Sequence, residues 1–123
     1  MNSAPTSTHL VDTDVLIWHL RGYPQATQRL NALTPLTLSA VTYLEVLQGV
    51  RNKTELAAIK KMLLLRHAII LPITEPITQQ AISLMESRAL SHGLQMADAL
   101  IAACALHHHL LLLTANTKHF QHI

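Results

Sequence analysis

The ten residues HLVDTDVLIW, numbers 9–18, join a short apolar segment to two carboxylates that directly follow it. We expect residues 9–12 to form a short buried strand, with a helix following through Leu16 and Leu20 and ending near Gly22. Asp12 then stands at the carboxyl end of the first strand. Ligands of open α/β sheets bind beyond the carboxyl ends of the strands, so this stretch indicates both a fold class and the place of a site.

Outward from this stretch, short apolar runs alternate with segments of helical periodicity. Further strands are predicted at 36–38, 68–71 and 110–114, and helices at 25–33, 40–50, 54–67, 76–92 and 96–108. Ser39 is the expected cap of the helix after it, and Gly93 the expected end of the helix before it. The leucines at 110–113 are typical of a parallel strand covered on both faces. The alternation predicts an α/β sandwich of four strands, with at most a stub of a fifth after Phe120.

The chain has the size of one compact domain, and we expect residues 1–123 to form it. Half of the residues are hydrophobic, yet no uninterrupted apolar run reaches the roughly 18 to 20 residues of a membrane span. The first ten residues lack the basic and apolar regions of a secretory signal. A single cysteine, Cys104, cannot form an internal disulfide. These features predict a cytoplasmic protein without a membrane role.

The acidic residues carry the strongest functional signal. Four of the seven lie inside apolar segments, namely Asp12, Asp14, Glu45 and Asp98. Ionised carboxylates that are partly buried without partners cost roughly several kcal/mol each, and most basic residues are remote in sequence from these four. A bound cation is therefore the expected partner. Because all the ligands are hard oxygens, Mg²⁺ or Mn²⁺ is favoured over zinc.

Three of these acids are expected to meet at one edge of the sheet. Asp12 ends the first strand, and Glu45 and Asp98 lie in the first turns of helices that follow a strand or a turn. Asp98 shares its helical face with Ile101 and Ala105, at i+3 and i+7, so it lies at the mouth of the face that packs inward. We therefore expect a semi-buried carboxylate there.

Each acid also has an ordinary structural role open to it. Glu45 stands three places after Thr42, which matches a capping box. Asp98 can complement the helix dipole from the first turn. Asp14 can ligate a metal directly, cap the helix that follows, or support the ligands from behind, and the cap or supporting role is the favoured interpretation.

Three blocks of the chain together resemble the PIN-domain nucleases, especially the VapC-type ribonuclease toxins of bacterial and archaeal toxin–antitoxin pairs. The blocks are LVDTDVLI (10–17), LSAVTYLEVLQGV (38–50) and MADALIAACALHHHLLLLTANTKHF (96–120). The resemblance implies a three-layer α/β/α sandwich around a central, mostly parallel sheet of four to five strands. It also implies a metal-dependent endoribonuclease, and it carries the catalytic and metal-ligating roles onto Asp12, Glu45 and Asp98.

The chain departs from the fully acidic pattern of this family near its end. Asn116 stands where many members have an aspartate, and His119 stands where an acid is common. One metal ion at Asp12 and Asp98 is therefore favoured over two, because a neutral amide is a weaker ligand for a hard cation. Thr114 and Asn116 can hydrogen-bond a phosphate or a metal-bound water, or they can belong to an ordinary turn.

The reaction implied by the resemblance is hydrolysis of RNA phosphodiester bonds. The metal ion lowers the pKa of a bound water and positions it for in-line attack, while Glu45 orients or deprotonates that water. A cognate antitoxin is the expected partner, covering the acidic pocket and laying an apolar helix into a groove between helices. The resemblance also implies a homodimer.

Five of the nine Lys and Arg residues lie within 16 positions of the chain. Among them, Arg51, Lys53, Lys60 and Lys61 are candidates for contacts with RNA phosphates. A solvated helix face is the alternative, because lysines beside the predicted core residues Ile59 and Leu63 are natural surface residues.

Three rival interpretations fit part of the pattern. A strand ending in Asp-x-Asp also describes the haloacid-dehalogenase-like phosphatases, but these need a further lysine and a later acidic pair, and only Asp98 remains to supply them. A response-regulator receiver needs an aspartate after a third strand, and none lies between Asp14 and Asp98. The third rival is a PIN fold that serves as a binding module, its nuclease activity lost through Asn116.

Overall fold

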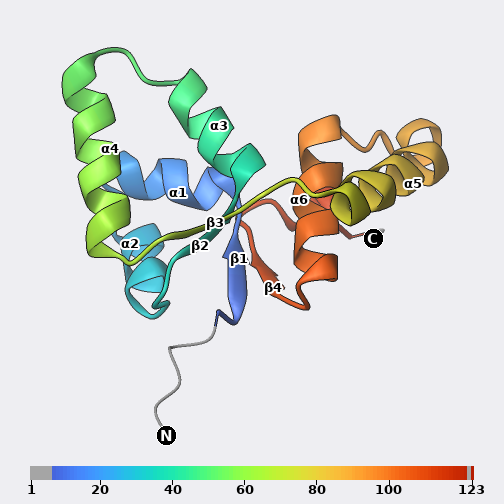
Figure 1. Ribbon diagram of the computed structural model, residues 1–123, viewed down its shortest axis with the longest axis horizontal. Coiled ribbons are helices and arrows are strands. Elements are labelled where there is room, and N and C mark those ends of the chain that lie inside the picture. The colour runs from blue at the N-terminus through green and yellow to red at the C-terminus, as the bar shows by residue number, and fades with distance from the viewer. Residues whose placement is uncertain (1–6, 122) are drawn as a thin grey trace, which may run out of the picture.

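The computed structural model describes residues 7–121 and 123 (Figure 1). The strands are β1 (His9–Val11), β2 (Thr37–Ser39), β3 (Ile69–Leu71) and β4 (Leu111–Leu113). The helices are α1 (Thr13–Leu20), α2 (Pro24–Asn31), α3 (Ala40–Gln48), α4 (Lys53–Leu65), α5 (Glu75–His92) and α6 (Met96–His107), followed by the short 3-10 helix η1 (Thr117–His119). The predicted strands and helices are confirmed, with ends that differ by one or two residues.

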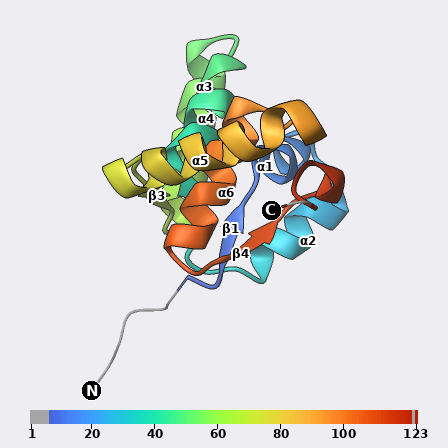
Figure 2. The same ribbon diagram turned by 90° about the vertical axis from the view of Figure 1, so that its right-hand side faces the viewer.

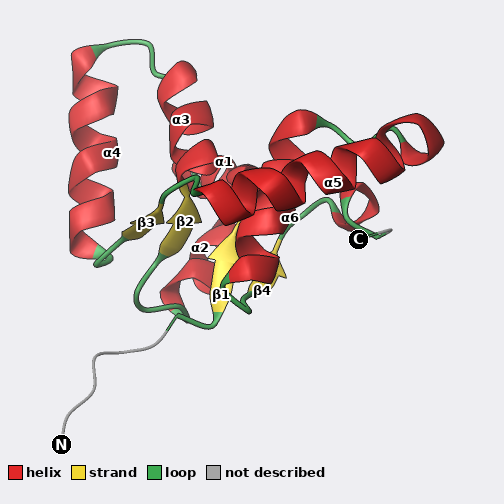
Figure 3. Ribbon diagram, turned by 45° about the vertical axis from the view of Figure 1, so that its right-hand side comes forward, coloured by secondary structure: helices red, strands yellow, loops and turns green. Residues whose placement is uncertain are grey.

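The four strands form two parallel, hydrogen-bonded pairs. In one pair β1 lies along β4, with Val11 opposite Leu113, and in the other β2 lies along β3, with Ser39 opposite Leu71. Because β1 also lies against β2, the order across the molecule is β4, β1, β2, β3 (Figure 3). The parallel arrangement brings the carboxyl ends of all four strands to the same edge.

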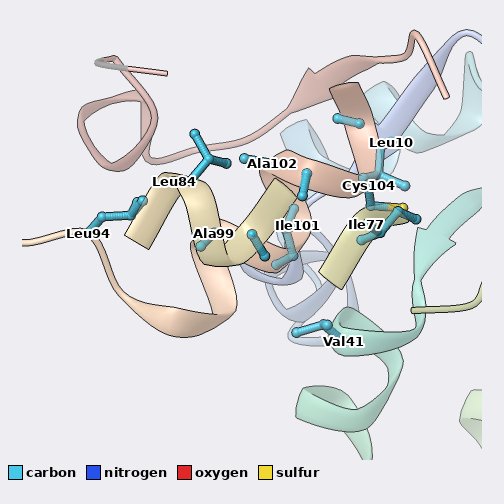
Figure 4. Close-up of a cluster of buried hydrophobic side chains, with 12 residues drawn as sticks. Leu10, Val41, Ile77, Leu84, Leu94, Ala99, Ile101, Ala102 and Cys104 are labelled. Atoms are coloured by element: carbon cyan, nitrogen blue, oxygen red, sulfur yellow. The ribbon is translucent and has the colours of Figure 1, made fainter. Parts of the chain in front are cut away.

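Two neighbouring residues of β1 enter two different hydrophobic cores. Leu10 packs into a cluster built mainly by α5 and α6, which also contains Ile77 and Ile101 (Figure 4). Val11 points to the other face and joins a cluster of α1, α2 and α4 that contains Leu16. Figure 2 shows α6 on one side of β1 and α2 on the other. The predicted three-layer α/β/α sandwich is therefore confirmed, with a middle layer in which the four strands lie in a row as two hydrogen-bonded pairs, where one continuous sheet of four to five strands was expected.

Capping residues set the start of α3 and the end of α5, two helices that follow strands. The Ser39 hydroxyl accepts a hydrogen bond of 3.1 Å from the backbone N–H of Val41, as predicted for the start of α3. At the end of α5, Gly93 has a φ of 65°, the left-handed conformation that a glycine adopts without strain. Both predicted helix boundaries are confirmed.

The strands at the two sides of the sheet are less covered than the sequence predicts. Leu111 in β4 is 67% exposed, and Ile69 and Ile70 in β3 are 40% and 39% exposed. The expected burial of the leucine run on both faces is wrong at its first strand residue, because β4 and β3 each lie at an outer side of the row of strands. The described residues after Phe120 form no fifth strand.

Among the described residues, no helix combines the length and the apolar character that crossing a lipid bilayer requires. Cys104 lies on α6 with its thiol in the hydrophobic core, and the residue is 1% exposed. Burial raises the pKa of the thiol, as expected for an unreactive cysteine.

Candidate active site

Asp12 lies where β1 ends and α1 begins. Its backbone N–H donates to the carbonyl of Leu113 over 2.9 Å, so the residue continues the pairing of β1 with β4. One carboxylate oxygen accepts the backbone N–H of Thr13 (2.8 Å) and caps α1, and the other accepts the hydroxyl of Thr114 (2.8 Å). The residue is only 6% exposed. Sequence position and both hydrogen bonds thus hold this carboxylate at the edge of the sheet.

Asp14 lies in the first turn of α1, and it is not the helix cap. That part of the prediction is wrong because Asp12 occupies the cap position. Asp14 Oδ1 instead accepts the backbone N–H of Val15 (2.7 Å) and lies 3.4 Å from the N–H of Ala115. Its Oδ2 lies 3.5 Å from the hydroxyl oxygen of Thr114. Asp14 therefore ties the start of α1 to the loop after β4.

Asp98 lies in the first turn of α6, as predicted, with its side chain 16% exposed. Its Oδ2 is 3.2 Å from Nδ1 of His119, whose Nε2 is 3.1 Å from the side-chain nitrogen of Asn116. If the amide donates to Nε2, the ring proton is on Nδ1 and faces the carboxylate. The backbone N–H of Asn116 in turn donates to the Thr114 hydroxyl oxygen (3.0 Å). One short segment thus contacts both Asp12 and Asp98.

Glu45 lies in the second turn of α3, one turn later than expected. Its Oε1 accepts the hydroxyl of Thr13 over 2.6 Å, and the same hydroxyl oxygen lies 3.1 Å from that of the fully buried Thr42. The capping-box interpretation is wrong, because Ser39 caps α3. Thr13 was not predicted as a site residue; its one signal in the sequence is a hydroxyl between the two candidate ligands Asp12 and Asp14.

The four acidic side chains lie close enough to influence one another's charge. Burial raises the pKa of Asp12 to about 6; the neighbouring charges of Asp14 and Asp98 add to the rise, and the Thr114 hydrogen bond opposes it. Burial also raises the pKa of Asp98, and the charges of Glu45 and Asp14 add to it. The edge of the sheet therefore concentrates negative charge in a largely desolvated place.

The donor chemistry of this cluster fits a hard divalent cation, because its donors are carboxylate oxygens that repel one another. As they stand, no three Asp, Glu, His or Cys side chains of the described residues are grouped so that they could hold a metal ion. Glu45 is bonded to Thr13, and Asp98 to His119. An ion bound by Asp12, Glu45 and Asp98 together would therefore require side-chain rotations that exchange these bonds for metal ligation.

Two cavities adjoin the acidic cluster, one at Glu45 and the other at Asp98. The larger, about 510 Å³, lies between α1, α3 and α4, is lined by apolar side chains such as Ile17 and Ile59, and reaches Glu45. The smaller, about 190 Å³, lies between α5, α6 and η1 and reaches Asp98. The cluster thus opens into one mainly apolar and one mainly polar cavity.

The predicted basic group on α4 lies mostly on the surface. Arg51 forms a bidentate ion pair with Glu55, with a shortest distance of 2.8 Å, and its side chain is 82% exposed. Lys53, Lys60 and Lys61 are exposed. This arrangement agrees with the solvated-face alternative, although Arg51 also lines the larger cavity.

Two helical layers around parallel strands, with clustered acids where the strands end, define a class of α/β protein with an acidic site at the carboxyl edge of its strands. Within this class, the sequence model of the PIN domain matches residues 9–123. Ribonuclease VapC10 of Mycobacterium tuberculosis (strain ATCC 25618 / H37Rv) is 36% identical over 115 residues, which cover 90% of this chain and 84% of that protein. Ribonuclease VapC19 of the same strain is 34% identical over 117 residues, with 90% of each chain covered.

A solved structure described as a toxin–antitoxin complex from Klebsiella pneumoniae matches with a TM-score of 0.77 and 32% identity. The match covers 94% of this chain and 92% of that chain. The chain therefore belongs to the PIN domain family, in the group that contains the VapC ribonucleases.

Proposed function

We propose that this protein is an endoribonuclease that hydrolyses RNA phosphodiester bonds with a Mg²⁺ or Mn²⁺ ion held by Asp12, Asp98 and Glu45, and that it is the toxin of a toxin–antitoxin pair. The observation that carries the proposal is the meeting of three separate segments at one edge of the sheet. Asp12 from β1, Glu45 from α3 and Asp98 from α6 form one acidic cluster there. The relatives named as ribonucleases support the same reaction.

A divalent ion at this cluster would supply a water of lowered pKa and positive charge for the phosphate oxygens. The residues of the chain prepare the place for it. Thr114 donates to Asp12 and so favours the ionised form of a carboxylate that burial otherwise disfavours. The segment from Thr114 to His119 also contacts Asp98, so one loop sets the spacing of two ligands.

We assign to Glu45 the role of orienting the attacking water or accepting its proton. In the described structure its Oε1 accepts the Thr13 hydroxyl, which holds the side chain beside the cluster; on turning to ligate the ion, Oε1 would exchange that hydroxyl for the metal, and Oε2 would accept a proton or a water hydrogen. Thr13 is a positioning residue in this scheme. It follows Asp12 directly, so the contact couples the orientation of Glu45 to the strand end that carries the first ligand.

The larger cavity is the proposed docking place of the antitoxin. It is bounded by α1, α3 and α4, combines apolar walls with Arg21 and Arg51, and ends at Glu45. An apolar helix laid into this groove would lie beside the acidic cluster and block it. The solved toxin–antitoxin complex that the chain resembles supports such a partner.

We further propose that residues 1–123 fold as a single PIN domain that acts in the cytoplasm. A homodimer is also proposed, supported by apolar side chains left exposed on the two outer strands, Ile69 and Ile70 on one and Leu111 on the other.

The proposed reaction is tested by incubating the purified protein with structured RNA in Mg²⁺ or Mn²⁺, beside EDTA and an Asp12→Ala variant. Cleavage is expected only with metal and only in the wild type. Metal-dependent cleavage that survives in the variant would remove the assignment of the site. If no RNA is cut under any condition, the chain is better described as a binding module.

A further inference from the structure

The smaller cavity, next to Asp98, has a basic lining that the proposed chemistry does not use. Arg88 and His92 come from the last turns of α5, and Lys118 and His119 come from η1. Segments about thirty positions apart in the chain thus place four nitrogen-bearing side chains around one opening. In the described structure Asp98 is the single acidic side chain among the lining residues.

The charges of this lining favour an anion. Arg88 and Lys118 are cationic at neutral pH, so the described lining holds two cationic side chains against one acidic side chain, even with both imidazoles neutral. That carboxylate faces Nδ1 of His119 at 3.2 Å, so an imidazole N–H already partly offsets its charge on this side. The first turn of α6 adds the partial positive charge of a helix start.

The size and position of the cavity narrow the choice of anion. Its volume of about 190 Å³ is roughly that of six water molecules, enough for a phosphate group and part of a sugar but not for a folded peptide segment. Asp98 belongs to both the cavity wall and the acidic cluster. A nucleic-acid strand that crosses the cluster therefore has this cavity as its immediate neighbour.

We propose that the cavity binds a backbone phosphate of single-stranded RNA, one that neighbours the bond to be cut, through Arg88 and Lys118. The proposal rests on the proposed function, because it names how the same substrate is held. Arg88 supplies a guanidinium group, whose Nη1 also donates to the Ser87 hydroxyl oxygen (2.8 Å), and Lys118 supplies a point charge from η1. His92 can donate a further hydrogen bond.

The experiment measures RNA binding apart from cleavage. A fluorescein-labelled single-stranded RNA of mixed sequence is titrated with the full chain in EDTA, and anisotropy is recorded at several salt concentrations. Lys118→Ala and Arg88→Ala are each expected to weaken binding about threefold to tenfold at low salt, and to reduce the slope of log K against log salt by about 0.7. Lys118→Glu should weaken binding further.

Arg29→Ala is the matched control, because Arg29 is an exposed cationic residue on α2, outside the cavity. It is expected to leave the salt slope unchanged. An unchanged slope in both Lys118→Ala and Lys118→Glu would overturn the proposal, and so would an equal loss in Arg29→Ala. Lys118 is exposed and lies at the surface, so melting temperatures of these variants should match the wild type and exclude misfolding.

Cleavage of RNA by the wild type with Mn²⁺ separates this proposal from the proposed function. Lost binding in the Lys118 variants together with absent cleavage would keep the phosphate site and remove the nuclease. Cleavage by the wild type with unaltered binding in the variants would keep the nuclease and remove the phosphate site.

Discussion

Replacing Asp12 by Asn should stabilise the metal-free protein at neutral pH and have little effect at acidic pH. The folded protein raises the pKa of Asp12 from 3.8 to about 6, mainly through burial. A group whose pKa is raised on folding favours the folded state below its unfolded pKa, and it loses that contribution as the pH rises through the folded value. In the wild type, the loss therefore falls between about pH 4 and pH 7.

The size of the effect follows from the shift of about two pKa units. At about 1.4 kcal/mol for each unit, ionised Asp12 costs about 3 kcal/mol above pH 7 and less than about 1 kcal/mol at pH 4. An unfolding entropy of about 2.1 cal/mol/K for each residue converts 3 kcal/mol into roughly 10 °C for a chain of this length. Asn keeps an oxygen for the N–H of Thr13, and its amide can donate to the Thr114 hydroxyl oxygen.

The assay is thermal unfolding of both proteins in EDTA at pH 4 and pH 7.5, followed by circular dichroism. Glu86→Gln, which changes an exposed carboxylate in the middle of α5, is the control and should show a difference from wild type that does not vary with pH. The reasoning is refuted if Asp12→Asn is less stable than wild type at pH 7.5. A difference that stays constant from pH 4 to pH 7.5 would refute it as well.

Three further predictions concern the same site and its neighbour. Saturating Mn²⁺ at about 100 times its dissociation constant should add about 2.7 kcal/mol of stability to the wild type and nothing to Asp98→Ala, and equal melting shifts in both would count against metal at Asp98. Thr114→Val should lower stability by about 1 to 2 kcal/mol at pH 7.5 but little at pH 4, because its hydroxyl donates to ionised Asp12; a loss independent of pH in the same melting assay would contradict this. Ala58→Trp, which fills the larger cavity, should prevent co-purification with the cognate antitoxin while RNA cleavage persists, whereas Ala57→Trp, outside the cavity, should not; equal co-purification of the two variants would remove the docking assignment.

Much of the fold could be predicted because buried side chains recur in the sequence with the spacing of a strand or of a helix. Leu10 and Val11 precede Asp12 in a run that alternates between two cores, and Ile101 and Ala105 repeat along one face of α6. The solvent exposure of the outer strands could not be predicted from such spacing. An apolar run such as 110–113 looks the same in a central strand and in an outer one, and only the order of the strands decides that Leu111 is exposed.

The acidic residues of the candidate site could be predicted from the sequence, but the hydrogen bonds that they form could not. Carboxylates inside apolar segments are unusual, so the neighbouring residues in the sequence suffice to single out Asp12, Glu45 and Asp98 as candidates. The hydrogen bond from Thr13 to Glu45 joins residues 32 positions apart, and no local sequence pattern predicts a contact at that separation. The same holds for the contact of His119 with Asp98, which depends on where η1 crosses the start of α6.

If the acidic cluster binds a metal ion that promotes RNA cleavage, replacing one of its carboxylates by the isosteric amide should slow the chemical step, which a single-turnover cleavage rate measures. Wild type and Asp98→Asn are compared at saturating protein and Mn²⁺, with RNA binding measured in parallel by anisotropy. We expect the variant to bind RNA at least as tightly as the wild type and to cleave it at least about 100-fold more slowly. A cleavage rate within about twofold of the wild type would contradict metal binding by Asp98.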